Sequence, residues 1–284
     1  MLASDADGAA IAPRDAATVL LLRDHVEGGF EIYLVRRHAK SGFMAGAHVF
    51  PGGKVDAADG RPSMWERVLG LEVAQARERL GESLPDERVR ALFVAAARET
   101  FEEAGVLLGA HGPAPKALRE RANAGESFEA LLVEAGIRLS LGELWPYSRW
   151  ITPEAEPRRY DARFFLARVP REQRAAPDLM ETTAGAWMKP REALDAASRG
   201  EIALPPPTLR SLENLALEPS AERAIERARE RRPPVIAPRL VMAGQVPTIV
   251  LPGDPEHPIS RAVLPGSTRI ALVDGRWVSQ DVDS

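Results

Sequence analysis

The stretch from Asp86 to Gly105 constrains the fold more than any other part of this 284-residue chain. Its pattern predicts a long helix with Asp86 as the N-cap and Gly105 at the C-terminal stop. Near the end of this helix, Glu99, Glu102 and Glu103 are spaced at i, i+3 and i+4, which places three carboxylates on one face. Because like charges in this arrangement repel, a hard dication such as Mg²⁺ or Mn²⁺ is the simplest compensating partner. The triplet alone leaves a solvated polar face open as the alternative.

Short apolar runs and helical periodicities on either side of this helix predict a mixed α/β architecture. Residues 18–23 and 30–36 are expected to pair as a hairpin, and residues 61–81 carry apolar side chains at helical spacing. Further strands are predicted at 144–151, 163–169 and from 186 to 188, and further helices at 114–122, 127–134, 190–198, 209–217 and 221–231.

The chain divides into three parts by composition. Residues 1–15 contain three Asp and no basic region followed by an apolar run, so we expect a flexible arm and no secretory signal. Residues 16–232 are expected to form the main domain, with a helical insertion at about 57–90. Short apolar runs predict a small β-rich extension for residues 233–284, and we find no repeat at a fixed period.

Charge and composition exclude several classes of partner. The 37 Lys and Arg against 41 Asp and Glu give a net charge of −4, which provides no electrostatic footprint for duplex nucleic acid. No apolar run approaches the roughly 20 residues of a membrane-spanning helix. The chain has no Cys, which removes disulfides and thiolate metal sites and favours a cytoplasmic location. The sequence leaves open whether the chain forms a homodimer.

Residues 98–106, Arg-Glu-Thr-Phe-Glu-Glu-Ala-Gly-Val, resemble the second half of the Nudix box, and residues 51–55, Pro-Gly-Gly-Lys-Val, resemble its first half. In that family 14 positions separate the box Gly from the box Arg, whereas Gly53 and Arg98 are 45 positions apart, so about 31 residues are inserted. Counted back from Arg98, the place of the first box Glu holds Arg90, which departs from the family pattern. Residues 150–166 and the spacing from Glu181 to Pro190 extend the resemblance over roughly residues 17–215.

The resemblance implies an α/β/α sandwich with a mixed sheet. It also assigns roles to residues that match the box. Glu99, Glu102 and Glu103 correspond to metal ligands, Arg98 to their orienting salt-bridge partner, and Gly53 to the residue that lets the loop backbone approach the metal site. Glu181 is a weaker match to a late acidic residue that binds metal or acts as base in some members.

The activity implied by the resemblance is Mg²⁺- or Mn²⁺-dependent hydrolysis of the diphosphate bond in a nucleoside diphosphate linked to another moiety. A branch with an insertion at this point includes animal peroxisomal coenzyme A diphosphatases, which favours coenzyme A or acyl-CoA as substrate. The alternatives are ADP-ribose, dinucleotides, dinucleoside polyphosphates, or a non-catalytic ligand sensor or scaffold. Cationic side chains expected to line the anion site are Arg36, Arg37, Lys40, Arg158 and Arg159, with Arg163 as a further candidate.

Overall fold

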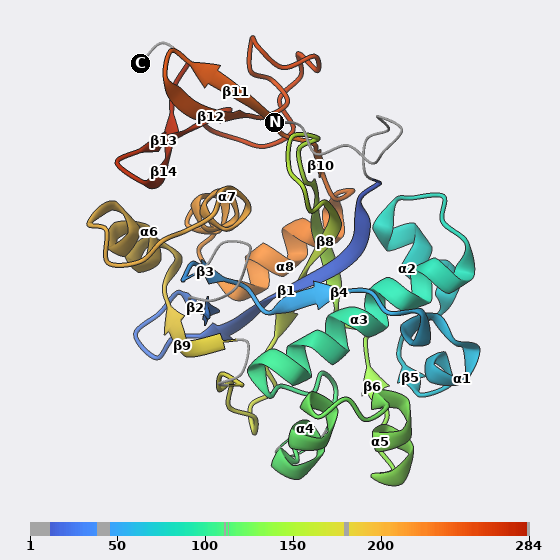
Figure 1. Cartoon of the computed structure of the whole chain (residues 1–284). Helices are drawn as coiled ribbons and strands as arrows, with labels where there is room; N and C mark the ends of the chain where they lie inside the picture. The colour runs from blue at the N-terminus through green and yellow to red at the C-terminus, as the bar shows by residue number, and fades with distance from the viewer. Residues whose placement is uncertain (1–11, 39–45, 111, 113, 179–181, 283–284) are drawn as a thin grey trace.

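A mixed eight-stranded sheet forms the centre of the computed structural model, which describes residues 12–38, 46–110, 112, 114–178 and 182–282 (Figure 1). Strand β1 runs parallel to β8 and antiparallel to β2, and the short β10 runs parallel to β7. The sheet contains β1 (Arg14–Asp24), β2 (Phe30–Arg37), β3 (His48–Val49), β4 (Gly52–Lys54), β7 (Trp145–Ile151), β8 (Tyr160–Arg168), β9 (Thr182–Met188) and β10 (Val235–Ile236).

Helices cover both faces of this sheet because β1 is apolar on both of its sides. Ala17, Val19 and Leu21 face α3 (Asp86–Ala104), whereas Leu20 and Leu22 face the opposite core. The helices of that opposite core are α6 (Pro190–Ser198), α7 (Pro206–Leu215) and α8 (Ala221–Glu230). The expected α/β/α sandwich with a mixed sheet is therefore confirmed.

Helix α3 has the expected bounds, with one change at its start. Pro85 occupies the N-cap position and Asp86 is the first helical residue, so the prediction of Asp86 as the cap was wrong by one position. Gly105 ends the helix in the left-handed conformation at φ +67°, which glycine adopts without the steric cost that a Cβ imposes.

The inserted segment is not the continuous helix that its periodicity suggests. Residues 61–81 fold into α1 (Pro62–Trp65), β5 (Val68–Leu69) and α2 (Val73–Leu80), after the 3₁₀ turn Ala57–Gly60. The chain turns at Gly70, whose φ is +71°, and β5 pairs in parallel with β6 (Leu139–Ser140). Backbone pairing with a distant segment therefore overrides the local helical spacing. Two small helices follow α3: α4 (Lys116–Asn123) and α5 (Phe128–Glu134).

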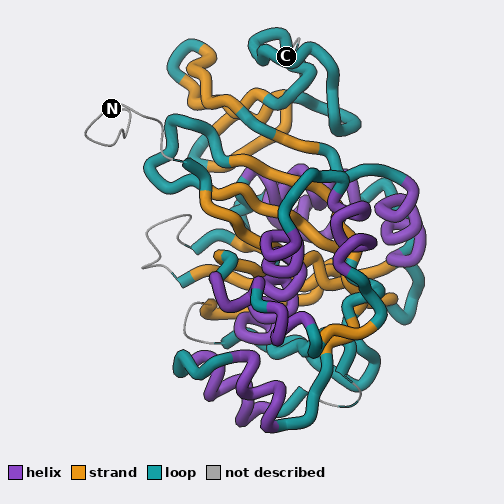
Figure 2. The backbone as a smooth tube through the Cα atoms, turned by 90° about the vertical axis from the view of Figure 1, so that its right-hand side faces the viewer, coloured by secondary structure: helices purple, strands orange, loops and turns teal. Residues whose placement is uncertain are grey.

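The C-terminal extension forms a second sheet that packs on the main domain. Its antiparallel strands are β11 (Arg239–Ala243), β12 (Val246–Val250), β13 (Arg269–Val273) and β14 (Arg276–Gln280), in that order. Ile249 and Ile270 join the same core as α7 and α8, so the extension shares a core with the main domain. Figure 2 shows this sheet at the opposite end of the molecule from α4 and α5.

Two boundaries of the expected parts differ from the structure. Strand β1 begins at Arg14, so the last two residues of the predicted arm belong to the main sheet, while residues 1–11 lie outside the described part. Strand β10 pairs with β7, so the main sheet extends to Ile236, past the expected end at 232. Among the described residues, no helix has the length and apolar character to cross a membrane.

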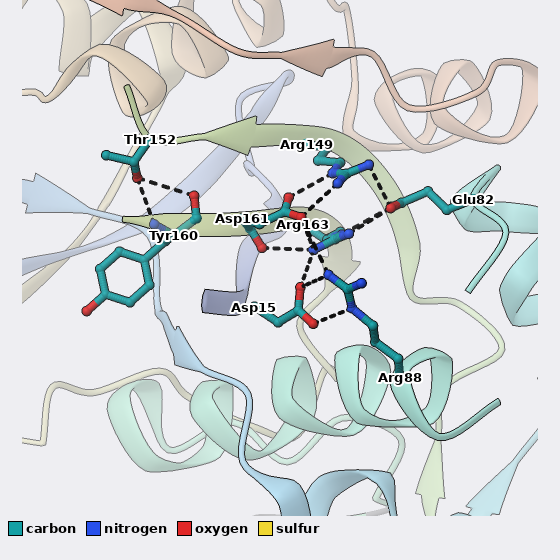
Figure 3. A network of polar contacts seen from close by, with 8 residues as sticks. All are labelled: Asp15, Glu82, Arg88, Arg149, Thr152, Tyr160, Asp161 and Arg163. Atoms are coloured by element: carbon teal, nitrogen blue, oxygen red, sulfur yellow. Dashed lines mark hydrogen bonds and ion pairs between the residues drawn. The ribbon is translucent and has the colours of Figure 1, made fainter. Parts of the chain in front are cut away.

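A buried ion-pair network joins the insertion to the sheet (Figure 3). Arg163 on β8 is 1% exposed and binds Asp15 at 2.6 Å, Glu82 at 2.7 Å and Asp161 at 3.0 Å. Arg149 contacts Glu82 and Asp161 as well, and Arg88 contacts Asp15. Arg163 is therefore a structural residue, and its assignment to an anion site is wrong because neighbouring carboxylates already bind its guanidinium.

Candidate functional site

A cavity of about 690 Å³ lies between the sheet, the end of α3 and the C-terminal extension. Ala16, Thr18, Trp150, Ala162 and Phe164 contribute to it from β1, β7 and β8. The β4 loop and α3 supply polar lining residues: Gly52, Gly53, Lys54, Asp56, Arg98, Glu99, Glu102 and Glu103. The structure therefore brings together both separated halves of the box in one cavity.

Arg98 is the centre of the acidic cluster. Its Nη1 donates to Glu99 Oε1 at 2.9 Å and to Glu102 Oε2 at 3.0 Å. Its Nε and Nη2 donate to the two oxygens of Asp59, both at 3.0 Å. The expected role of Arg98 as the orienting salt-bridge partner of the box carboxylates agrees with this geometry, because one planar guanidinium fixes three carboxylates.

The structure changes which residue occupies the place of the first box Glu, from Arg90 to Asp59. Counted forward from Gly53, the sixth position is Asp59, and the insertion then lies between Asp59 and Arg98. Arg90, to which the backward count led, instead donates from Nε to the Gly60 carbonyl oxygen. An acid therefore does occupy the first box position. Asp59 is buried, and a count in both directions from the two halves of the motif would have found it.

Two contacts hold the glycine loop against the helix. Glu103 accepts a hydrogen bond from the Gly52 backbone N–H at 2.9 Å, and Arg98 Nη2 donates to the Lys54 carbonyl at 2.9 Å. A Cβ added to Gly53 would lie 2.5 Å from Oε2 of Glu99. The absence of a side chain at Gly53 is therefore required for the loop to approach the acidic cluster.

The pKa values of the clustered side chains show that Arg98 only partly compensates the negative charge of the carboxylates. Burial raises the pKa of Glu99 to about 7; the Arg98 charge opposes this rise and the Glu102 charge adds to it. Burial also raises the pKa of Glu102. For Arg98, burial alone would lower the pKa, but its bonds to Asp59 and the charge of Glu99 raise it. Additional positive charge near Glu99 and Glu102 would favour their ionised forms.

The donor set fits a hard divalent cation. Glu99, Glu102 and Glu103 all line the same cavity, and carboxylate oxygens are the ligands that Mg²⁺ and Mn²⁺ prefer. Glu99 and Glu102 each use one oxygen in their bonds to Arg98. Within the described ranges no three acidic or imidazole side chains already converge as a complete metal centre.

The candidate anion-binding residues separate into three groups. Arg37 and Arg158 line the cavity, and Arg37 Nε is buried with no hydrogen-bond partner in the described part of the chain. Arg36 and Arg159 do not line the cavity; Arg36 is exposed, and Arg159 donates from Nε to the Thr152 carbonyl. Lys40 lies outside the described residues. So does Glu181, the candidate metal ligand or base.

Sequence reasoning missed several residues of the cavity. Asp178 is an additional acid in its lining, next to the undescribed segment 179–181. Three consecutive prolines, Pro205 to Pro207, form part of one wall, and Pro238, Ile249 and Trp277 come from the C-terminal extension. Apolar residues far apart in the sequence give no local signal of a shared cavity, whereas Asp178 had a weak signal because it is near Glu181.

Replacement of Gly53 by Ala is expected to lower the catalytic rate of the site by about tenfold or more. The new methyl group would displace the Glu99 carboxylate from its place beside Arg98. Steady-state kinetics of the Gly53→Ala, Glu99→Asp and double variants test this mechanism, since shortening residue 99 relieves the clash. Strictly additive losses in the double variant would contradict displacement of Glu99 as the cause.

Comparisons with known proteins identify the family to which this sequence is similar. A family model described as the NUDT19 Nudix domain matches residues 12–215. The acyl-coenzyme A diphosphatase NUDT19 of Homo sapiens is 33% identical over 230 residues, with 66% of this chain and 61% of that protein covered. The Gallus gallus protein of the same name is 34% identical over 225 residues, with 63% and 59% covered. The chain thus spans about three fifths of the length of these relatives.

A solved structure shows the same likeness at the level of the fold. The crystal structure of a NUDIX hydrolase from Alicyclobacillus acidocaldarius superposes with a TM-score of 0.64 at 31% identity. The match covers 77% of this chain and 97% of that one. The family match ends at residue 215, so it does not include the C-terminal sheet.

Proposed function

The chain belongs to the Nudix hydrolase family, and from this premise we propose that it hydrolyses the diphosphate bond of coenzyme A or an acyl-CoA. The observation that carries the proposal is one cavity in which Glu99, Glu102 and Glu103 lie with Arg37, whose buried Nε has no hydrogen-bond partner among the described residues. The names of the NUDT19 relatives support acyl-CoA as the substrate class. A sensor has no need for three carboxylates in one cavity, two of them positioned by Arg98.

The products follow from the bond that breaks. One P–O bond of the diphosphate is cleaved, the oxygen of water ends on the attacked phosphorus, and the other phosphate leaves with the bridging oxygen. Coenzyme A would give adenosine 3′,5′-bisphosphate and 4′-phosphopantetheine. No redox change occurs, so the reaction needs no co-reactant except water.

A divalent cation, which we propose is Mg²⁺ or Mn²⁺, would be held by Glu99, Glu102 and Glu103 and would supply positive charge against the diphosphate oxygens. Arg98 keeps Glu99 and Glu102 oriented into the cavity through its Nη1 bonds, and Asp59 holds Arg98 in turn. Glu103 anchors the glycine loop through the Gly52 N–H. The carboxylates are therefore held in fixed positions. A cation bound by them would lie between these acids and the anionic phosphates of the substrate.

The 3′-phosphate of coenzyme A requires cationic donors besides those at the diphosphate. Arg37 on β2 meets this need because it lines the cavity and its Nε lacks a hydrogen-bond partner within the described part of the chain, and Arg158 lines the cavity as well. An arginine can contact a phosphate through two parallel, charge-assisted hydrogen bonds. Arg36 is adjacent in sequence but is exposed and outside the cavity, since successive strand residues point to opposite faces.

Replacement of Arg37 by Ala is expected to raise KM for coenzyme A by about tenfold to a hundredfold, because a hydrogen bond to a charged group contributes about 1.5–3 kcal/mol. KM for dephospho-coenzyme A, which lacks the 3′-phosphate, should change little. Steady-state kinetics with both substrates measure the difference, and Arg36→Ala is the matched control. An equal rise in KM for both substrates would show that Arg37 serves the diphosphate or the fold.

The proposed activity is tested by a panel of diphosphates with and without Mg²⁺ or Mn²⁺. The panel contains coenzyme A, acyl-CoA, ADP-ribose, a reduced dinucleotide and a dinucleoside polyphosphate, with product identity determined by mass spectrometry. We expect cation-dependent hydrolysis with coenzyme A or acyl-CoA preferred. Preferred hydrolysis of another member would reassign the substrate, and no hydrolysis of any member with either cation would refute the enzyme assignment.

A further inference from the structure

The catalytic cavity has an apolar wall that the family match does not include. Pro238, Ile249 and Trp277 line the same cavity as the box carboxylates, yet all three lie beyond residue 215. Ile249 and Trp277 come from the C-terminal sheet, which shares a core with α7, and Pro238 immediately precedes its first strand. The extension therefore forms part of the site as well as packing against the domain.

The strand register shows which other residues share this wall. Side chains directly opposite each other in an antiparallel pair point to the same face of the sheet. Leu240 is opposite Ile249 and Met242 is opposite Pro247, so Leu240 and Met242 lie on the face of Ile249. Ile249 is opposite Ile270, and Trp277 is opposite Leu272, two positions beyond Ile270, so Trp277 shares that face too.

The wall continues from the cavity to solvent at the edge of the sheet. Strand β11 is an edge strand, and on it Leu240 is 39% and Met242 is 58% exposed. Edge strands of soluble proteins usually carry charged side chains that discourage association. Exposed apolar side chains in line with a cavity are instead typical of a surface that contacts a ligand.

We propose that this face of the C-terminal sheet, the acyl strip of Leu240, Met242, Ile249 and Trp277, binds the acyl chain of an acyl-CoA whose diphosphate lies at the box carboxylates. The inference rests on the proposed diphosphatase activity and adds the residues that select the acyl group. The side chains of Leu240, Met242 and Ile249 carry no hydrogen-bond donor, which suits a hydrocarbon chain and leaves the polar edge of a nucleobase without partners.

The test uses exposed positions, so that the fold is preserved. The double variant Leu240→Thr/Met242→Thr removes apolar surface from the strip and keeps residues that favour strands. Val278→Thr is the matched control, because Val278 is 42% exposed on the same sheet but points to its other face. The quantity measured is the ratio of kcat/KM for octanoyl-CoA to kcat/KM for coenzyme A.

We expect the wild-type chain to prefer octanoyl-CoA by at least about tenfold, since a fully buried methylene contributes about fourfold in binding. The double variant should reduce this ratio to within about threefold of unity, and Val278→Thr should retain the wild-type ratio. Trp277→Ala should lower the ratio in the same direction as the double variant.

The possible outcomes separate this inference from the proposed function. Hydrolysis of coenzyme A without preference for octanoyl-CoA would overturn the acyl strip and leave the diphosphatase activity in place. Equal losses on both substrates in the double variant would also overturn it, because the strip would then contact a part that both share. Failure of the wild type to hydrolyse either substrate would refute the proposed function and the strip together.

Discussion

Replacement of Glu102 by Gln is expected to lower kcat by at least about 10²-fold while the fold is retained. The change removes one negative charge from the carboxylate set and alters side-chain volume very little. Glu102 lies on the cavity face of α3 and its carboxylate accepts a hydrogen bond from Arg98, so no packing of the core depends on that carboxylate. Glu103→Gln should have an effect of similar size, because Glu103 belongs to the same set and also anchors the Gly52 N–H.

The measurement is single-substrate kinetics at saturating Mg²⁺, with thermal unfolding followed in parallel. Glu87→Gln is the matched control, since Glu87 lies on the same helix, is exposed and does not line the catalytic cavity. Wild-type turnover in both the Glu102 and Glu103 variants would refute the assignment of these carboxylates to the cation. An equal loss in the Glu87 variant would point to a general effect of charge on the helix.

Replacement of Arg163 by Ala is expected to lower the free energy of unfolding by about 3–5 kcal/mol. Removal of one partner of a buried ion pair leaves its counterparts charged and without compensation. Three carboxylates, those of Asp15, Glu82 and Asp161, lie within 3.0 Å of the Arg163 guanidinium, and Arg88 and Arg149 compensate only part of their charge. The loss should therefore be far larger than that for an exposed pair.

Equilibrium unfolding in urea measures this loss. Arg168→Ala is the matched control, because Arg168 lies on the same strand and pairs with Asp24, but the two side chains are 43% and 58% exposed. Exposed pairs contribute about 1 kcal/mol or less. Similar losses in both variants would show that the buried network does not stabilise the fold more than a surface pair does.

Local sequence signals were sufficient for the elements whose stability is local. Helix α3 ends where Gly105 predicts, and the hairpin of β1 and β2 forms as expected because apolar residues on both faces of the two strands pack into the cores on either side of the sheet. The acidic triplet and Arg98 were predicted by spacing and by resemblance to the Nudix box, and both lie in one cavity.

The errors arise where contacts between distant residues decide the outcome. The helical spacing of residues 61–81 gave way to the pairing of β5 with β6, in which Val68 is opposite Leu139, 71 positions further along the chain. Arg163 is indistinguishable from Arg158 as a surface cation in the sequence, and only the convergence of β1, β8 and Glu82 buries it. The contribution of Trp277 to the cavity depends on how the two sheets pack, which no local pattern encodes.

The ion pair between Asp59 and Arg98 has a consequence for how this site tolerates change over evolutionary time. The two residues close the inserted loop at its base through two hydrogen bonds of 3.0 Å. Each doubling of a flexible loop adds only about 0.6 kcal/mol to the entropy cost of closing it. Exposed turns between the acid and the arginine can therefore gain or lose residues at small entropic cost, provided that Glu82 keeps its place beside Arg163.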